Sequence, residues 1–265
     1  MREEAPAASP SEPCESVNIL MVAALLREVR SFLRRAAARP RGGLGAPAWE
    51  LALSDGAAVM LLAGVGPEAA ARTAALALAR CRPRTLISLG FGGALTPEAA
   101  PGTLVLGERF RQYDPDRGIL AAAPGPAPPR LLAGLVRRLR DAGLPSLTGT
   151  IITAPRILHK AAEAGPLMEL PCPVLDLESA PLAAAAAERG LAFLGLRAVT
   201  DGAGEEIPEF IREACRRGAE PGPAAAFAWA ARDPRRLLML LRLWRRSRLA
   251  GRLLARALEV LLPVL

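Results

Sequence analysis

The sequence contains few of the side chains on which metal centres and histidine-based catalysis depend. Among 265 residues there is one His, His159, and one Tyr, Tyr113. A metal site built on paired His ligands lacks its second ligand, and a Ser-His-Asp triad would rest on His159 alone. We therefore expect no metal, and we interpret His159 as a residue at the surface or at the start of a helix.

Paired cysteines and long apolar runs are also missing. The four Cys residues are widely scattered and form no Cys-x-x-Cys pair, so we expect reduced thiols in a cytoplasmic protein. No stretch reaches the ~18 uninterrupted apolar residues of a transmembrane helix. Residues 1–16 are acidic, rich in Pro and Ser, and have no apolar segment. They predict a disordered leader and not a signal peptide.

Lys is nearly absent, and acidic residues are outnumbered. The formal net charge is +8, and Lys160 is the only Lys, so the positive charge comes almost entirely from Arg. This balance favours anionic partners such as phosphates or lipid headgroups. Aromatic side chains are not interleaved with the Arg residues, and no zinc-finger or RNP-like pattern occurs, so we expect no nucleic-acid partner.

Short apolar runs alternate with helical patterns along residues 17–222. VNILMVAAL (residues 17–25), LISLG (86–90) and LAFLGLRAVTD (191–201) are typical of buried strands, whereas PEAAARTAALALARC (67–81) is typical of a helix that begins with Pro. The alternation predicts an α/β fold with three layers, α/β/α, around a central mixed, largely parallel twisted sheet. In such sheets, functional sites lie beyond the carboxyl ends of the strands.

Three acidic residues follow predicted strands in apolar surroundings. Glu28 lies just after the first strand, Glu178 follows the strand in LDLES, and Asp201 ends LGLRAVTD. Buried carboxylates are costly unless something holds them. Taken alone, Glu28 or Glu178 is equally consistent with an acid in the first turn of a helix. The three together, with the glycine-rich turn at 90–93, favour a site at one edge of the sheet.

Residues 223–265 form a basic, Leu-rich segment that we expect to be a C-terminal helical extension. Drawn as one helix, it carries Leu237, Leu241 and Trp244 on one broad side and most of its Arg residues opposite, while Arg248 interrupts the apolar side and Gly251 offers a break. Basic amphipathic helices can lie in an anionic membrane interface. Packing on the core or on a second subunit is an equally open interpretation.

Five segments spread over residues 17–203 carry a family resemblance. They are AALLREV, GVGPEAAARTAA, LISLGFGGALTPEAAPGTLVLGE, LDLESAP and RAVTDGAG. In this order they resemble the nucleoside phosphorylase and nucleosidase superfamily, which includes purine nucleoside phosphorylases and methylthioadenosine/S-adenosylhomocysteine nucleosidases. The segment 223–265 is similar to the C-terminal extension of hopanoid-associated phosphorylases, which are implicated in removing adenine from adenosylhopane.

The resemblance implies cleavage of the N-glycosidic bond of an adenine nucleoside. It gives Asp201 the role of the acid that protonates N7 of the purine, and the apolar strand would raise the pKa of Asp201 so that the proton is held until needed. It gives Glu28 the role of the acid that orients the attacking water. It assigns the ribose hydroxyls to Glu178, preceded by Leu177 where the family has Met.

Two positions depart from the family pattern. In the nucleophile pocket, formed by Gly90 and Phe91, Phe91 replaces a Ser that contacts phosphate or water in many relatives. Among the base-binding positions, Ile157 replaces a purine-stacking Phe, while Leu158 would offer backbone contacts and Gly92 would lie against the base. Both changes make the pocket more apolar, which suits a lipidic substrate better than free phosphate.

Four further charged residues lie near these positions in the sequence. We interpret Asp176 as structural, and we interpret Arg197 as a structural partner for a carboxylate near Asp201. Arg156 and Lys160 flank the predicted base loop, and we expect both to be solvated. Arg27, next to Glu28, is expected to point away from the site.

The predicted function is release of adenine from lipid-linked adenosylhopane in hopanoid biosynthesis, by phosphorolysis or by hydrolysis. One alternative is a soluble methylthioadenosine/S-adenosylhomocysteine-type nucleosidase, and another is a degenerate protein that binds a nucleoside or a partner without catalysis. No cofactor is expected, and inorganic phosphate is a candidate co-substrate. We expect a homo-oligomer in the cytoplasm, free or held at the inner face of the cell membrane through residues 223–265.

Overall fold

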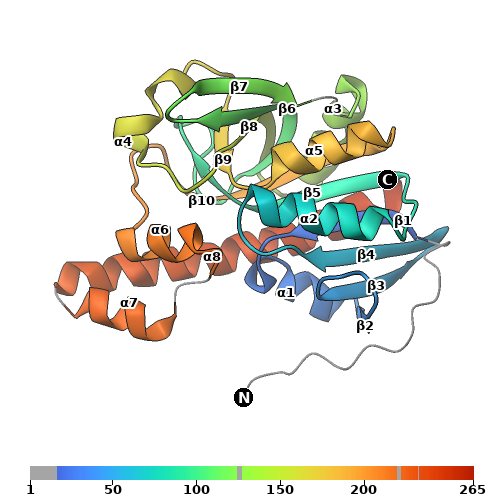
Figure 1. Ribbon diagram of the computed structural model, residues 1–265, viewed down its shortest axis with the longest axis horizontal. Coiled ribbons are helices and arrows are strands. Elements are labelled where there is room, and N and C mark those ends of the chain that lie inside the picture. The colour runs from blue at the N-terminus through green and yellow to red at the C-terminus, as the bar shows by residue number, and fades with distance from the viewer. Residues whose placement is uncertain (1–16, 124–126, 220–221, 232) are drawn as a thin grey trace.

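A twisted mixed sheet lies between two layers of helices in the computed structural model (Figure 1). The structure describes residues 17–123, 127–219, 222–231 and 233–265. The strands are β1 (Val17–Ala23), β2 (Arg39–Arg41), β3 (Ala48–Leu53), β4 (Gly56–Leu62), β5 (Thr85–Ala94), β6 (Leu104–Asp114), β7 (Gly118–Ala123), β8 (Ser146–Thr153), β9 (Pro173–Asp176) and β10 (Ala192–Asp201). The helices are α1 (Leu26–Arg35), α2 (Pro67–Leu78), α3 (Pro129–Asp141), α4 (Lys160–Glu163), α5 (Ser179–Glu188), α6 (Glu209–Arg216), α7 (Pro223–Ala230) and α8 (Pro234–Leu261).

Parallel pairing joins the central strands, in the order β4, β1, β5 and β10. Antiparallel strands β3 and β2 extend this part of the sheet on the β4 side. On the other side, β10 pairs with β6, and the path through β6, β8 and β9 returns to β5, which closes a ring of strands. The predicted three-layer α/β/α fold with a mixed sheet is thus confirmed.

The core lies on both faces of the sheet. One cluster packs apolar side chains of α2 and α5 against the sheet, and the other packs α1, α3 and the second half of α8 against the opposite face. Local sequence explains individual elements: Pro67 stands at the start of α2, where its missing N–H is not needed, and residues 54–55 close the hairpin between β3 and β4.

Helix α8 has two unlike halves. From Ala250 onward one face of the helix is buried. It packs closely on α1 because Gly251 has no side chain: a Cβ there would lie 3.0 Å from the carbonyl oxygen of Arg27. Residues 234–249 instead expose apolar side chains, among them Leu238 (64% exposed) and Trp244 (55%). The second half of α8 therefore packs on the core, which was one of the two interpretations of this segment. The predicted boundary at residue 222 stays a prediction, as does the leader 1–16, which lies outside the described residues.

The cysteines differ from one of our expectations. Cys172 is a free thiol, but Cys81 takes part in a disulfide, so the expectation of reduced thiols throughout is wrong at Cys81. Within the described ranges, no helix is long and apolar enough to cross a membrane.

Candidate active site

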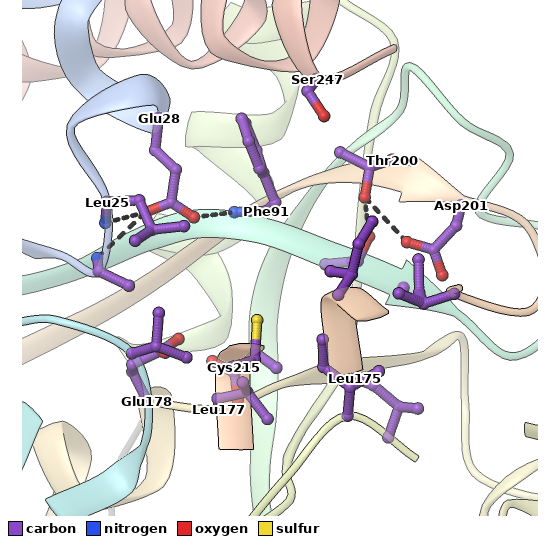
Figure 2. Close-up of a pocket in the computed structure, with 18 of the residues that line it drawn as sticks. Leu25, Glu28, Phe91, Leu175, Leu177, Glu178, Thr200, Asp201, Cys215 and Ser247 are labelled. Atoms are coloured by element: carbon purple, nitrogen blue, oxygen red, sulfur yellow. Dashed lines mark hydrogen bonds between the residues drawn. The ribbon is translucent and has the colours of Figure 1, made fainter. Parts of the chain in front are cut away.

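A cavity opens where β1, β5 and β10 end, and the segment that follows β9 closes its other side (Figure 2). All the predicted site residues line it except Gly90, which lies directly beneath Glu28. The residues brought together come from segments that are up to 173 positions apart in the chain, as Glu28 and Asp201 are. This is the edge of the sheet where the sequence predicted a site.

Glu28 is a buried carboxyl group held by three backbone N–H groups. Its Oε2 accepts hydrogen bonds from Ala24 N (3.0 Å) and Leu25 N (2.9 Å), and its Oε1 accepts one from Phe91 N (2.9 Å). A Cβ at position 90 would lie 2.8 Å from Oε1, so Gly90 lets strand β5 pass close below. Burial raises the pKa of Glu28, while the bonds from Phe91 and Leu25 act to lower it.

Glu178 stands at the opposite side of the cavity, at the residue before α5. Its Oε1 accepts a hydrogen bond from Gly66 N at 3.0 Å, which ties it to the turn before α2. Burial, followed by the nearby negative charge of Asp176, raises the pKa of Glu178 to about 8. The group is therefore largely protonated at neutral pH, and it can both donate and accept hydrogen bonds to hydroxyl groups.

Asp201 ends β10 and forms an ion pair with Lys160. Lys160 Nζ donates to Asp201 Oδ2 at 2.5 Å and to the carbonyl oxygen of Gly202 at 2.8 Å, while Thr200 Oγ1 donates to Asp201 Oδ1 at 2.8 Å. Burial raises the pKa of Asp201, and Lys160 opposes this shift. The expectation that Lys160 is solvated is wrong, because its side chain is only 5% exposed.

A second ion pair lies deeper, between Arg197 and Asp176. Arg197 Nε donates to Asp176 Oδ2 at 3.0 Å, and Arg197 Nη2 also donates to the hydroxyls of Ser88 (2.7 Å) and Ser179 (2.9 Å). Asp176 Oδ1 accepts from Thr153 Oγ1 at 2.6 Å. These side chains support the base of the site, in agreement with the structural role expected for Asp176 and Arg197.

The predicted base loop follows β8. Ile157 and Leu158 line the cavity, and Gly92 faces it from β5. Arg156 donates to both carboxylate oxygens of Glu163, and its side chain remains 35% exposed. Arg27, which we expected to point away, contributes to the cavity lining and lies 6.0 Å from the ring of Phe91.

One wall of the cavity was not predicted. Helix α6 and the segment before it contribute Ile207, Ile211 and Cys215, and α8 contributes Leu243 and Ser247. Leu243 and Ser247 are four positions apart and so lie on one face of α8. The amphipathic pattern of α8 predicted an apolar face, but nothing in the sequence indicated that this face borders the site.

The arrangement suits acid–base chemistry on a polar ligand that carries an apolar group. Three carboxyl groups with different partners surround the cavity, and burial raises the pKa of each. Raised pKa values let carboxyl groups exchange protons near neutral pH. Among the described residues, no group of three His, Cys, Asp or Glu side chains could hold a metal ion.

Sequence comparisons agree with this geometry. The family model of the phosphorylase superfamily matches residues 20–221. The chain is 31% identical over 181 residues to a 5′-methylthioadenosine/S-adenosylhomocysteine nucleosidase of Geobacillus kaustophilus, an alignment that covers 62% of this chain and 76% of the relative. The corresponding nucleosidase of Geobacillus thermodenitrificans is 30% identical over the same length.

Solved structures share the fold. A 5′-methylthioadenosine/S-adenosylhomocysteine nucleosidase from Neisseria meningitidis, in complex with methylthio-immucillin-A, aligns with a TM-score of 0.68 and 18% identity over 94% of this chain and 100% of its own. Futalosine hydrolase of Helicobacter pylori aligns with a TM-score of 0.66 and 14% identity, over 92% and 98% of the two chains. Together with the match of the family model over most of its length, these findings show that the chain is an enzyme of the phosphorylase superfamily.

Proposed function

We propose that this enzyme hydrolyses the N-glycosidic bond of an adenine nucleoside and releases adenine. The observation that carries the proposal is the convergence of Glu28, Glu178 and Asp201 on one cavity, each with a raised pKa; Glu28 and Asp201 are buried and Glu178 is partly buried. The bond breaks when the purine accepts a proton, the sugar carbon accepts a nucleophile and the ribose is held between them. The three carboxyl groups match these three requirements.

The steps balance as follows. Asp201 transfers its proton to N7 while the C1′–N9 bond breaks, so that adenine leaves as a neutral molecule. Glu178 binds the ribose hydroxyls and fixes the sugar. A water molecule bonded to Glu28 attacks C1′, and its proton passes to the Glu28 carboxylate. The products are adenine and the free sugar with a hydroxyl at C1′.

Water is a better candidate for the nucleophile than phosphate. The backbone N–H of Phe91, which would be a donor for an anion, is already bonded to the Glu28 carboxylate. A phosphate placed there would meet a carboxylate in a buried, poorly screened environment. The relatives from Geobacillus are named nucleosidases, which also favours hydrolysis.

The apolar wall of the cavity favours a nucleoside with an apolar, lipid-like 5′ substituent, and we propose adenosylhopane as the substrate. Ile207, Ile211 and Leu243 offer such a substituent dispersion contacts and no charge. The similarity of residues 223–265 to hopanoid-associated phosphorylases supports the same choice. Methylthioadenosine remains the second candidate, because the Geobacillus relatives carry its name.

We also propose a homo-oligomer that touches the inner face of the cell membrane. The family resemblance supports the oligomer, and the first half of α8 supports the membrane contact. There, exposed apolar side chains alternate with the exposed side chains of Arg235, Arg242, Arg245 and Arg248. Arg side chains bind anionic headgroups, while Leu and Trp enter the interface.

Adenine release tests the proposed reaction. Purified enzyme is incubated with adenosylhopane in mixed micelles or with methylthioadenosine, each with and without inorganic phosphate, and adenine is quantified by chromatography. Release from adenosylhopane without phosphate is the expected result. A strict need for phosphate would overturn hydrolysis, and release only from methylthioadenosine would overturn the lipid substrate. Absence of release from both would overturn the enzymatic proposal.

Vesicle binding tests the membrane contact. We expect the enzyme to sediment with vesicles of phosphatidylglycerol but not with phosphatidylcholine alone, and a Leu237→Ser, Leu238→Ser double variant to lose this binding. Both side chains are more than half exposed, so the changes should leave the fold intact. Light scattering of the same samples gives the oligomeric state, and an oligomer broken by the double variant would assign this surface to a second copy.

A further inference from the structure

The ion pair between Lys160 and Asp201 has a geometry that a solvated or purely structural pair would not need. Both side chains line the cavity, yet they are only 5% and 6% exposed. Nζ lies 2.5 Å from Asp201 Oδ2 and 2.8 Å from the carbonyl oxygen of Gly202. The ammonium group therefore fixes both the acid and the peptide that follows it.

The space around Asp201 suits the compact ammonium group of Lys160. A Cβ at position 93 would lie 2.6 Å from Asp201 Oδ2 and 3.3 Å from Lys160 Nζ, so the pair fills the space that Gly93 leaves. A guanidinium head is larger and planar, whereas an ammonium group is compact. Lys160 is the only Lys in a chain whose other cationic side chains are nearly all Arg, and it occupies this one position.

We propose that Lys160 is a positioning residue for the reaction, which stabilises Asp201 as that residue loses its proton to the purine. This inference rests on the proposed function. The ion pair of the structure corresponds to the state after the transfer; before it, Asp201 has taken up a proton and is a neutral acid beside the cation. When its proton has moved to N7, a carboxylate faces the ammonium group across 2.5 Å. The attraction thus appears in the transition state and is absent from the ground state, which is the condition for accelerating the step.

Burial raises the pKa of Asp201 and Lys160 lowers it, and the balance between them decides how well Asp201 can act as an acid. Burial alone would make Asp201 a weak acid that keeps its proton, whereas an exposed ion pair would leave it permanently ionised. An acid is most effective when it changes protonation near the working pH. Other charged groups near the pair are Glu205, in the loop after β10, Arg246 of α8, which pairs with Glu205, and Glu206, which accepts a hydrogen bond from Lys160 N.

The pH dependence of kcat tests this role. For Lys160→Met, we expect kcat to fall about 10-fold or more at the optimum of the unchanged enzyme, with little change in KM. The alkaline limb, where Asp201 loses its proton, should move to higher pH because the cation that favours ionisation is gone. The acidic limb, which belongs to Glu28, should stay. Lys160→Arg keeps the charge in a larger head group, so its alkaline limb should lie closer to the original position than that of Lys160→Met.

Two outcomes would overturn the proposal. If kcat falls but the alkaline limb does not move, Lys160 only supports the fold, and if neither changes, it has no role. Arg35→Met is the matched control, since it removes a cation from an ion pair with Glu259 at the surface, and it should change neither quantity.

A readout that needs no turnover separates this proposal from the proposed function. Carboxyl 13C NMR of Asp-labelled enzyme follows the titration of Asp201, whose signal is identified by its loss in Asp201→Asn. We expect the titration to move to higher pH in Lys160→Met, and an unmoved titration would refute the proposal. Enzyme that releases no adenine but shows this movement would overturn the proposed function and leave the coupling of Lys160 to Asp201 standing.

Discussion

Strand β10 carries two buried ion pairs four positions apart, and their surroundings differ. The Arg197–Asp176 pair is closed: its side chains are 1% and 0% exposed, and Ser88, Ser179 and Thr153 satisfy the remaining polar atoms. The Lys160–Asp201 pair borders the cavity. The comparison teaches that an ion pair enclosed on all sides supports packing, whereas a pair beside a cavity is placed to act on a ligand, as we propose for Lys160 and Asp201.

Breaking the closed pair should have the largest effect. Arg197→Met leaves Asp176 buried without its cation, and removing one partner of a buried pair costs about 3–5 kcal/mol of unfolding free energy. Urea denaturation measures the loss. Arg35→Met, which removes a partly exposed pair, should cost at most about 1 kcal/mol. Equal losses of unfolding free energy in the two variants would contradict the proposed difference between the enclosed pair and the exposed one.

Breaking the open pair should reduce turnover, and it should cost less stability than breaking the closed pair, because the Asn amide oxygen can still accept a hydrogen bond from Lys160 Nζ. Asp201→Asn keeps the shape of the side chain but removes the proton donor, and loss of a general acid lowers rates by about 100- to 10,000-fold. Adenine release measures kcat, and thermal unfolding confirms that the variant is folded. Near-normal turnover would exclude Asp201 as the acid.

Glu178, at the opposite side of the cavity from Asp201, should give a pH-dependent signal. Its pKa is about 8 in the folded protein against 4.5 for the ordinary group, so the folded state binds more protons between these values. The stabilisation from Glu178 is therefore fully present below about pH 4.5 and is lost as the pH rises through about 8. Glu178→Gln should show a smaller decrease of unfolding free energy over this window in urea titrations.

The same variant tests ribose binding. Glu178→Gln keeps a side chain that can form hydrogen bonds but changes the arrangement of its donors and acceptors. We therefore expect KM to rise and kcat to fall, each by about 10-fold. Steady-state kinetics with the best nucleoside give both constants. Kinetics equal to those of the unchanged enzyme would remove Glu178 from the sugar.

The smallest expected effect concerns Ser179. Its hydroxyl is one of several acceptors of Arg197, at 2.9 Å, so Ser179→Ala should cost about 1 kcal/mol of unfolding free energy. We expect kcat to stay within about twofold of the unchanged enzyme, because Asp176 continues to hold Arg197. A large loss of turnover would show that the closed pair also takes part in the chemistry.

The sequence predicted the layers of the fold and the acids of the site for a shared reason. Buried strands have an apolar composition that local patterns reveal; Glu28 and Glu178 each follow such a strand, and Asp201 ends one. Their convergence then follows from the geometry of the sheet. Contacts between elements are a different matter, because a pattern shows which face of an element is apolar but not what covers it.

Lys160 and the α8 wall show this limit. Lys160 meets Asp201 across 41 positions of sequence, through the turn that follows β8, and a lone Lys in an Arg-rich chain was the only local sign. Leu243 and Ser247 reach the cavity because the second half of α8 is anchored on α1 and extends the helix past the site. Neither contact can be predicted from the spacing of apolar residues within one helix or strand.

The glycine-rich end of β5 has a consequence for how the pocket can be altered. A Cβ at position 90 would approach Glu28 Oε1 to 2.8 Å, one at 92 would approach Val174 Cγ1 to 2.6 Å, and one at 93 would approach Asp201 Oδ2 to 2.6 Å. Every substitution at these three positions thus displaces part of the site or its support. Phe91 alone within residues 90–93 has a side chain that lines the cavity, so libraries that seek new nucleoside specificities should vary Phe91 and retain its glycine neighbours.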